Sequence, residues 1–195
     1  LRNPCTSSQM PHVQAEGGCN DCPSGTFSNS TGNKKSSDCE ECPRDTFNAE
    51  SKKSSCGDCD LSEYTNGETG QTVCAVCDAG KQMSGAIGAR VCKDCAAGQV
   101  STTAGANCSN CSVGKYANSD KTECTLCGAG KWSNTAGADA SSTCQNCTAG
   151  KYSSAEGVDA EAKCNECPPG KWSADSPDSD GCDDCAVGRY NADSG

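Results

Sequence analysis

Apolar side chains stand far apart along this chain. One aromatic residue recurs roughly every 18 residues, which is the period of a repeat unit. The segments between, such as "SNTAGADASST", are rich in Ser, Thr, Asn, Gly and Ala and have no helical periodicity. The pattern therefore predicts short, irregular strands or a hairpin in each repeat, with little or no helix.

Ten C-x-x-C pairs set the spacing of this pattern. Their first members run from Cys19 to Cys182 and are separated by 16 to 20 residues. A fixed period of this size indicates a tandem array of structural units. We expect residues 1–18 to hold a partial first repeat and a linker, residues 19–181 a tandem array of nine repeats, and residues 182–195 a truncated last repeat.

Two further positions recur with the cysteines. Glycine usually stands three residues after the second cysteine, a position called +3 below, and an aromatic residue stands at +5. The +5 column contains every aromatic residue of the chain: Phe27, Phe47, Tyr64, Tyr116, Trp132, Tyr152, Trp172 and Tyr190. A +3 glycine permits a left-handed or tight-turn backbone. We expect this turn to lay the +5 ring over the neighbouring disulfide, as the only large apolar contribution of each repeat.

Composition explains why cysteine has to replace a hydrophobic core. Leu, Ile, Val and Phe number only 14, and the net charge is −10, a combination typical of disordered chains. Twenty-one cysteines, however, are the density of disulfide scaffolds outside the reducing cytosol. We therefore expect an extracellular or cell-surface protein.

No apolar run approaches the roughly 20 residues that cross a bilayer, so we expect no direct membrane insertion of this segment. The chain opens on "LRNPC", without an initiator Met or an apolar leader. This predicts either a removed signal peptide or an internal piece of a larger parent chain.

Cysteine number alone does not define the pairing, but the odd count separates two simple schemes. Closing every C-x-x-C pair on itself strands Cys5 and leaves the segments between pairs unconstrained. Joining the second cysteine of one pair to the first of the next strands only Cys185. This staggered scheme gives the bonds Cys5–Cys19, Cys22–Cys39, Cys42–Cys56, Cys59–Cys74, Cys77–Cys92, Cys95–Cys108, Cys111–Cys124, Cys127–Cys144, Cys147–Cys164 and Cys167–Cys182.

The unit seen in "CNDCPSGTFS", "CQNCTAGKYS" and "CNECPPGKWS" resembles the ephrin-receptor-like cysteine-rich repeat. It is also similar to the first half-module of tumour-necrosis-factor-receptor repeats, a resemblance that implies the staggered pairing. The resemblance covers almost the whole chain and implies an extracellular spacer, stalk or surface filament. Two repeats depart from it, because "CDLSEY" lacks the glycine and "CPRDTF" carries Asp45 in its place, which leaves their turn geometry open.

Zinc is the strongest rival to structural disulfides, because paired C-x-x-C motifs also suit four-cysteine ribbons. Against zinc stand the fixed glycine and aromatic columns, the odd cysteine count and an acidic composition, where nucleic-acid-binding ribbons need a basic face. A thioredoxin-like role is weaker, since a redox C-x-x-C occurs once, at a helix start in a βαβ unit. We expect no metal, no other cofactor and no nucleic-acid partner.

Catalytic chemistry has little support in the sequence. The single histidine, His12, has no evident partner, and no Gly-rich phosphate loop is present. We expect a protein that is not an enzyme.

Four N-glycosylation sequons fit a secretory route, and they begin at Asn29, Asn107, Asn110 and Asn146. Asn29 and Asn146, which have threonine in the third position, are the preferred sites. The Ser/Thr-rich segments offer further places for O-linked sugar. We therefore expect covalent glycans.

The +4 position carries a cation in six repeats: Lys81, Lys115, Lys131, Lys151, Lys171 and Arg189. The inner positions of the C-x-x-C pairs often carry Asp or Glu. One interpretation is a charge ladder between repeats or between neighbouring rods. The other is simple solubility, which is favoured because exposed ion pairs contribute about 1 kcal/mol or less.

The sequence thus favours an elongated rod of small disulfide-rich repeats, with short β-hairpins and irregular loops. We expect a glycosylated stalk, or a protomer that self-associates into a surface or flagellar filament. The alternative is a receptor ectodomain whose irregular repeats, around Cys42 to Cys108, bind a protein ligand.

Overall fold

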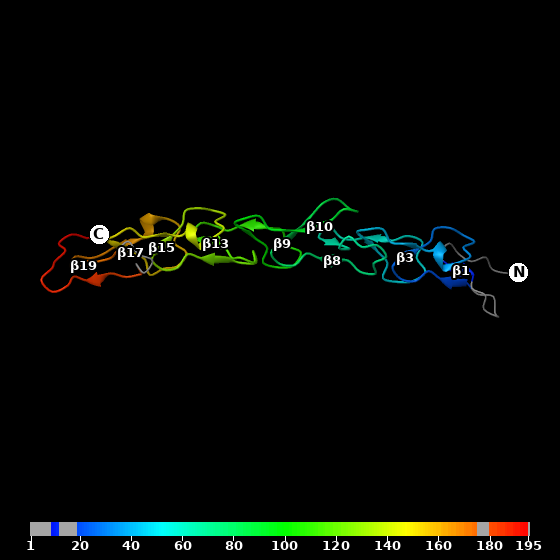
Figure 1. Ribbon diagram of the computed structural model, residues 1–195, viewed down its shortest axis with the longest axis horizontal. Coiled ribbons are helices and arrows are strands. Elements are labelled where there is room, and N and C mark those ends of the chain that lie inside the picture. Colours follow the sequence, from blue (N-terminus) through cyan, green and yellow to red (C-terminus); the bar gives the residue numbers. More distant parts are fainter. Residues whose placement is uncertain (1–8, 12–18, 175–179, 195) are drawn as a thin grey trace. The chain divides into compact units, whose positions relative to one another are not determined.

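Short antiparallel hairpins joined by loops make up the computed structural model, which describes residues 9–11, 19–174 and 180–194 (Figure 1). Contacts divide the chain into two compact units. The first contains Leu1–Asp78 and Gln82–Lys93, and the second contains Ala79–Lys81 and Asp94–Gly195. Helix in the described residues is limited to the 3-10 turns η1 (Ser36–Asp38), η2 (Ser141–Thr143) and η3 (Glu161–Lys163). The expected class of small disulfide-rich hairpin repeats with little or no helix is confirmed.

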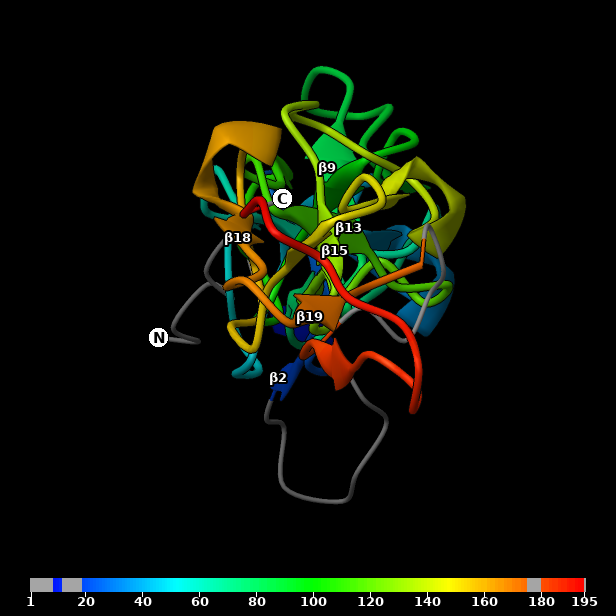
Figure 2. The same ribbon diagram turned by 90° about the vertical axis from the view of Figure 1, so that its left-hand side faces the viewer.

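Each hairpin is a separate sheet, and within the described ranges no sheet grows beyond two strands. Figure 2 draws the same short strands from a view turned by 90°. The pairs in chain order are β1 (Gln9–Pro11) with β2 (Cys19–Asp21), β3 (Thr26–Phe27) with β4 (Glu40–Glu41), β5 (Thr46–Phe47) with β6 (Gly57–Asp58), β7 (Glu63–Tyr64) with β8 (Ala75–Val76), β9 (Lys81–Ser84) with β10 (Val91–Asp94), β11 (Gln99–Val100) with β12 (Ser109–Asn110), β13 (Lys115–Ala117) with β14 (Cys124–Leu126), β15 (Lys131–Trp132) with β16 (Gln145–Asn146), β17 (Lys151–Tyr152) with β18 (Asn165–Glu166), and β19 (Lys171–Trp172) with β20 (Asp183–Asp184).

The hairpins place the +4 and +5 residues of one repeat against the C-x-x-C of the next. Lys131 and Trp132 pair with Asn146 and Gln145, which lie inside the following C-x-x-C. The same register recurs from β3 to β20 wherever the partners are defined. Strands of two residues are too short to persist on their own, so a covalent link has to hold them together.

Nine disulfides between described residues supply that link, with Cα–Cα distances of 5.5 to 6.0 Å, the ordinary range for such a bond. They are Cys22–Cys39, Cys42–Cys56, Cys59–Cys74, Cys77–Cys92, Cys95–Cys108, Cys111–Cys124, Cys127–Cys144, Cys147–Cys164 and Cys167–Cys182, the pairs of the staggered scheme. Cys19 is also disulfide-bonded, and its expected partner Cys5 lies outside the described residues. Cys185 is free and half-buried.

The most deeply buried apolar residues are the second cysteines of the pairs, whereas most of the +5 rings are half-buried. Cys22, Cys127 and Cys147 are completely buried, whereas Trp172 is 47 % exposed and Tyr190 is 88 % exposed. Val100, which takes the +5 place in its repeat, is 3 % exposed and packs with Cys111 and Ala117. The expectation that each ring covers the neighbouring disulfide stays a prediction.

The +6 position supplies the second buried column. Its buried members are small: Ser28, Asn48, Thr65, Ser101, Ala117, Ser133, Ser153 and Ser173. Ala117 packs in one cluster with Cys111 and Cys124, which are joined by a disulfide. Some buried hydroxyls bond between repeats, as Ser173 does by donating to the carbonyl of Lys151 in the preceding repeat at 2.7 Å. Small side chains here let the backbones of successive repeats approach closely.

Candidate functional site

Successive repeats are joined by a recurring set of backbone hydrogen bonds, and we call this region the repeat junction. It consists of the second cysteine of a pair, the +3 residue of the repeat before it and the loop of the repeat after it. The N–H of Cys127 donates to the carbonyl of Gly114 at 2.8 Å. The same bond to the preceding +3 carbonyl forms at Cys42, Cys59, Cys95, Cys111, Cys147, Cys167 and Cys185.

The loop of the following repeat returns a second bond. Gly137 donates its N–H to the carbonyl of Cys111, and Gly157 donates to the carbonyl of Cys127, both at 2.7 Å. The backbone donor and acceptor of these buried cysteines are therefore both satisfied by neighbouring repeats, as buried peptide groups require. The second cysteine of a pair therefore takes part both in a disulfide and in the repeat junction.

The +3 glycines also meet the loop of the repeat two positions further on. Gly114 has a φ of +75°, and a Cβ added to it would lie 2.2 Å from the carbonyl oxygen of Gly157. At Gly98 the corresponding distance, to the carbonyl oxygen of Gly137, is 1.8 Å. Glycine alone combines this backbone conformation with so close an approach. Each of these repeats therefore contacts its neighbour and its next neighbour.

Replacing Gly114 tests this close approach. We expect Gly114→Ala to loosen the junction, because a left-handed alanine is strained by roughly 1–3 kcal/mol before any clash is counted. Hydrogen exchange at the amides of Cys127 and Gly157 should accelerate. Gly128→Ala is the matched control, since nothing lies within 4 Å of a Cβ at that position. Equal protection of the two amides in both variants would contradict the junction.

The repeat that begins at Cys42 has no +3 glycine, and Asp45 adopts the left-handed conformation in its place, with a φ of +62°. Its side chain is 1 % exposed. The carboxylate accepts backbone N–H bonds from Thr65 at 3.3 Å, Gly88 at 2.7 Å and Arg90 at 3.0 Å. Gly88 and Arg90 belong to the loop two repeats further on, so the carboxylate bridges a gap that other repeats close by direct backbone approach.

At the neighbouring repeat, the Arg90 side chain donates to a cysteine carbonyl, the kind of carbonyl that accepts from a loop N–H elsewhere. It is 4 % exposed, and its Nη1 donates to the carbonyls of Cys59 at 3.2 Å, Glu63 at 2.7 Å and Asp60. These bonds hold the turn of the other repeat that lacks the glycine, "CDLSEY", in which the β7–β8 hairpin forms normally. Both repeats that lack the glycine therefore have the ordinary hairpin.

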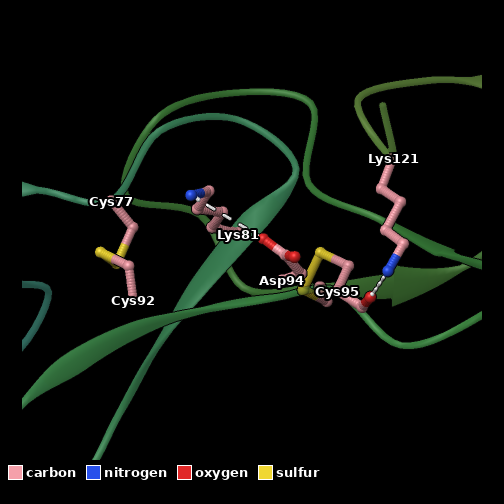
Figure 3. Close-up of polar contacts among 7 residues, drawn as sticks. Cys77, Lys81, Cys92, Asp94, Cys95 and Lys121 are labelled. Atoms are coloured by element: carbon pink, nitrogen blue, oxygen red, sulfur yellow. Dashed lines mark hydrogen bonds and ion pairs between the residues drawn. A yellow bond between two sulfur atoms is a disulfide. The ribbon is translucent and has the colours of Figure 1, made fainter. Parts of the chain in front are cut away.

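A lysine takes the same place in the second unit of the chain. The amine of Lys121 donates to the carbonyl of Cys95, as Figure 3 shows. At Cys111 the corresponding donor is the backbone N–H of Gly137. A backbone amide, a guanidinium and an amine therefore cap equivalent carbonyls in different repeats.

Removing the Asp45 carboxylate tests the bridge in the irregular repeats. We expect Asp45→Ala to cost roughly 1–3 kcal/mol, the penalty for leaving buried donors without an acceptor. Hydrogen exchange at Gly88 and Arg90 should accelerate, and the thermal midpoint should fall. Asp58→Ala is the control, because Asp58 is exposed. The bridge is refuted if both variants protect the two amides as the unaltered chain does.

Cross-strand pairs join the +4 column to the C-x-x-C of the next repeat. The Lys81 amine lies 3.8 Å from the Asp94 carboxylate (Figure 3), and the Lys171 amine lies 2.8 Å from that of Asp184. Both ion pairs form inside a hairpin, between its two strands. The acidic partners are largely exposed, so solvent screens each pair and its contribution to stability is small.

Asp184 raises the pKa of Lys171 above its ordinary value, first through the hydrogen bond and then through its charge, with a smaller contribution from the charge of Asp183. The stabilising contribution of the pair is therefore complete below the unfolded pKa and is lost as the pH rises through the folded pKa. We expect Asp184→Asn to return the Lys171 pKa toward its ordinary value, measured by NMR of the amine. Asp183→Asn should leave most of the rise, and equal falls would contradict the geometry.

The four sequon asparagines differ in their surroundings. Asn29, Asn107 and Asn110 are exposed, whereas Asn146 is half-buried and its amide oxygen accepts a 2.7 Å bond from Lys131. Of the two preferred attachment sites, Asn29 is therefore the more open. Glycosylation at all four stays a prediction.

The sulfurs that a zinc site would need are bonded to one another. Zinc binds thiolates, and a disulfide sulfur is not one, so the paired cysteines of this structure do not form four-cysteine sites. Among the described residues, no group of three or more His, Cys, Asp or Glu could hold a metal ion. In the same residues no helix has the length and apolar character needed to cross a membrane. His12 lies outside the described ranges.

Left-handed residues of the loops are the functional positions that the sequence pattern did not point to. They recur ten residues after the second cysteine, at Gly32, Lys52, Gly105, Lys121, Gly137 and Gly157. A signal for them exists, because "AGAD" at 136–139 and "EGVD" at 156–159 put glycine at the same offset. The small +6 residues form a second column of this kind.

No protein-family model matches this chain, and no curated protein matches it. The disulfides, the repeat junction and the exposed columns are therefore the observations from which a function is proposed.

Proposed function

We propose that this chain is an extracellular structural protein of ephrin-receptor-like repeats that serves as a glycosylated stalk or as a protomer of a surface or flagellar filament. Nine disulfides support the extracellular part of this proposal, because such bonds persist in oxidising compartments. The role is mechanical and not catalytic.

The proposal rests mainly on one observation: the disulfides form a covalent path that bypasses most of the backbone. Tension that enters at Cys22 crosses the disulfide to Cys39, follows the backbone to Cys42 and crosses the next disulfide. Loops with sequence separations of 13 to 17 therefore bear no load. From Cys22 to Cys182 this path extends to only about 140 Å, whereas the unlinked segment extends to about 550 Å. Resistance to elongation is what a stalk or fibre needs.

Single-molecule stretching tests this load path. We expect the linked segment of the oxidised chain to extend to about 140 Å and that of the reduced chain to about 550 Å, roughly four times as far. The measurement is force spectroscopy of the full chain with and without a reducing agent. An extension that reduction leaves unchanged would contradict the proposal.

A matched pair of variants sharpens this experiment. Cys111→Ser combined with Cys124→Ser frees one loop with a sequence separation of 13 and should add about 40 Å. Cys185→Ser is the control, since Cys185 is free, and it should add nothing. Equal extension of the two variants would show that the load does not pass through Cys111 and Cys124.

Electron microscopy of native material tests the filament form of the proposal. Like units present like surfaces along an array, and a head-to-tail contact between such arrays need not close into a ring. Fibres of regular diameter are the expected result. Separate short particles of one size would count against a filament protomer and favour the second candidate.

An exposed aliphatic surface in the first unit favours that second candidate, a receptor ectodomain that binds a protein ligand. Leu61, Val73 and Ile87 are 89 %, 67 % and 55 % exposed. Arg90 ties the turn that carries Leu61 to the loop that carries Ile87, so these two side chains belong to one region. Exposed apolar side chains that cluster in one region are typical of protein contacts.

A further inference from the structure

Three hollows in the second unit share one construction, and we call them the ring-and-cation hollows. Each is lined by the +5 ring of one repeat together with the +1 residue and the +4 cation of the next. Their members are Tyr116 with Gly128 and Lys131, Tyr152 with Pro168 and Lys171, and Trp172 with Ala186 and Arg189. Their volumes are about 460, 240 and 360 Å³ respectively. The repeat pattern therefore forms a small concavity of the same construction at three places.

The rings in these three hollows are partly exposed. Trp172 is 47 % exposed, and Tyr116 and Tyr152 are half-buried. A half-open aromatic ring offers apolar contact area on one side, with polar groups at its edge. Such a ring is a platform on which a flat apolar face can stack.

In two of the three hollows, the +4 cation lies beside an oxygen acceptor. The Lys131 amine donates to Oδ1 of Asn146 at 2.7 Å, and the Lys171 amine lies 2.8 Å from Oδ1 of Asp184. The lysine that lines each of these two hollows therefore has an oxygen acceptor directly beside its amine. Adjacent hydroxyl groups of one ligand could bond to both, because a hydroxyl both donates and accepts.

We propose that the ring-and-cation hollows bind a neutral carbohydrate polymer, with one pyranose unit stacked on each ring. A pyranose has a face of C–H groups and a rim of hydroxyl groups, which match an aromatic platform with a donor–acceptor edge. Pockets that bind small molecules have this composition, largely apolar walls with a few placed polar groups.

Charge argues for a neutral polymer over an anionic one. Asp184 offsets the charge of Lys171 within its hairpin. The chain as a whole carries a net charge of −10, which repels polyanions. Stacking and hydrogen bonds to uncharged hydroxyls therefore dominate recognition.

Recurrence of the hollow suits a ligand that also recurs. A polymer that fills one hollow presents its next units at a raised local concentration to the following hollows, which increases the overall affinity without new kinds of contact. This inference does not depend on filament assembly, because a stalk, a filament or a receptor could each present the same row.

The first unit provides an internal control. Its +5 rings Phe27 and Phe47 stand beside the +4 residues Thr26 and Thr46 of the same strands, where the second unit has lysines. The hollow at Phe47 differs in construction, because its cation is Lys53 of the same loop, paired with Glu50 at 3.0 Å, and not the +4 residue of the next repeat. Loss of these rings should leave carbohydrate binding intact.

The test is the binding of the full, oxidised chain to the hexasaccharides of cellulose, chitin and laminarin, measured by calorimetry, with dextran sulfate as the anionic probe. One variant carries Tyr116→Ala, Tyr152→Ala and Trp172→Ala. The control variant carries Phe27→Ala and Phe47→Ala. Intact mass without reduction shows that the disulfides of both variants have formed.

We expect at least one neutral hexasaccharide to bind more tightly than its disaccharide and to keep its affinity in about 1 M salt. The triple variant should bind it at least about tenfold more weakly, as expected from the loss of ring stacking, and the phenylalanine variant should match the unaltered chain. The proposal is overturned by absence of neutral-sugar binding, by equal loss in both variants, or by binding of dextran sulfate alone.

Discussion

A disulfide from the second cysteine of one repeat to the first cysteine of the next is the bond on which the remaining structure depends. Each closes a loop with a sequence separation of 13 to 17, which in the chain-entropy model is worth roughly 3 kcal/mol. The strands it joins are only two to four residues long. Without the cross-link, this composition has too few aliphatic side chains to bury. The sulfur of the second cysteine is the centre of each repeat for this reason.

Two consequences follow from burying cysteine in place of rings. The peptide groups of the buried cysteine must be satisfied, and the junction does so with donors and acceptors from adjoining repeats. The +4 side chains and most +5 side chains stay at least partly exposed and form recurring columns. The junctions and the exposed columns thus both follow from the buried cysteines. The proposed stalk depends on the disulfides and junctions, and the proposed carbohydrate hollows depend on the exposed columns.

Periodicity in the sequence was enough to predict the hairpins and the near absence of helix, because cysteine spacing constrains the chain directly. It did not point to the buried +6 column, since spacing alone does not say which neighbouring residues face inward. The bridge from Asp45 to Gly88 and Arg90 joins positions in different repeats. Such a contact breaks the repeat pattern, so no period could indicate it. Lys121 was hidden for the same reason, because its side chain does what a backbone amide does elsewhere.

Disulfide mapping of the native protein tests the central claim most directly. Proteolysis without reduction, followed by mass spectrometry, should recover linked peptides that join Cys111 to Cys124 and Cys127 to Cys144, with Cys185 outside the staggered set. Peptides closed within a pair, such as Cys108 to Cys111, or free thiols that hold zinc, would contradict the account.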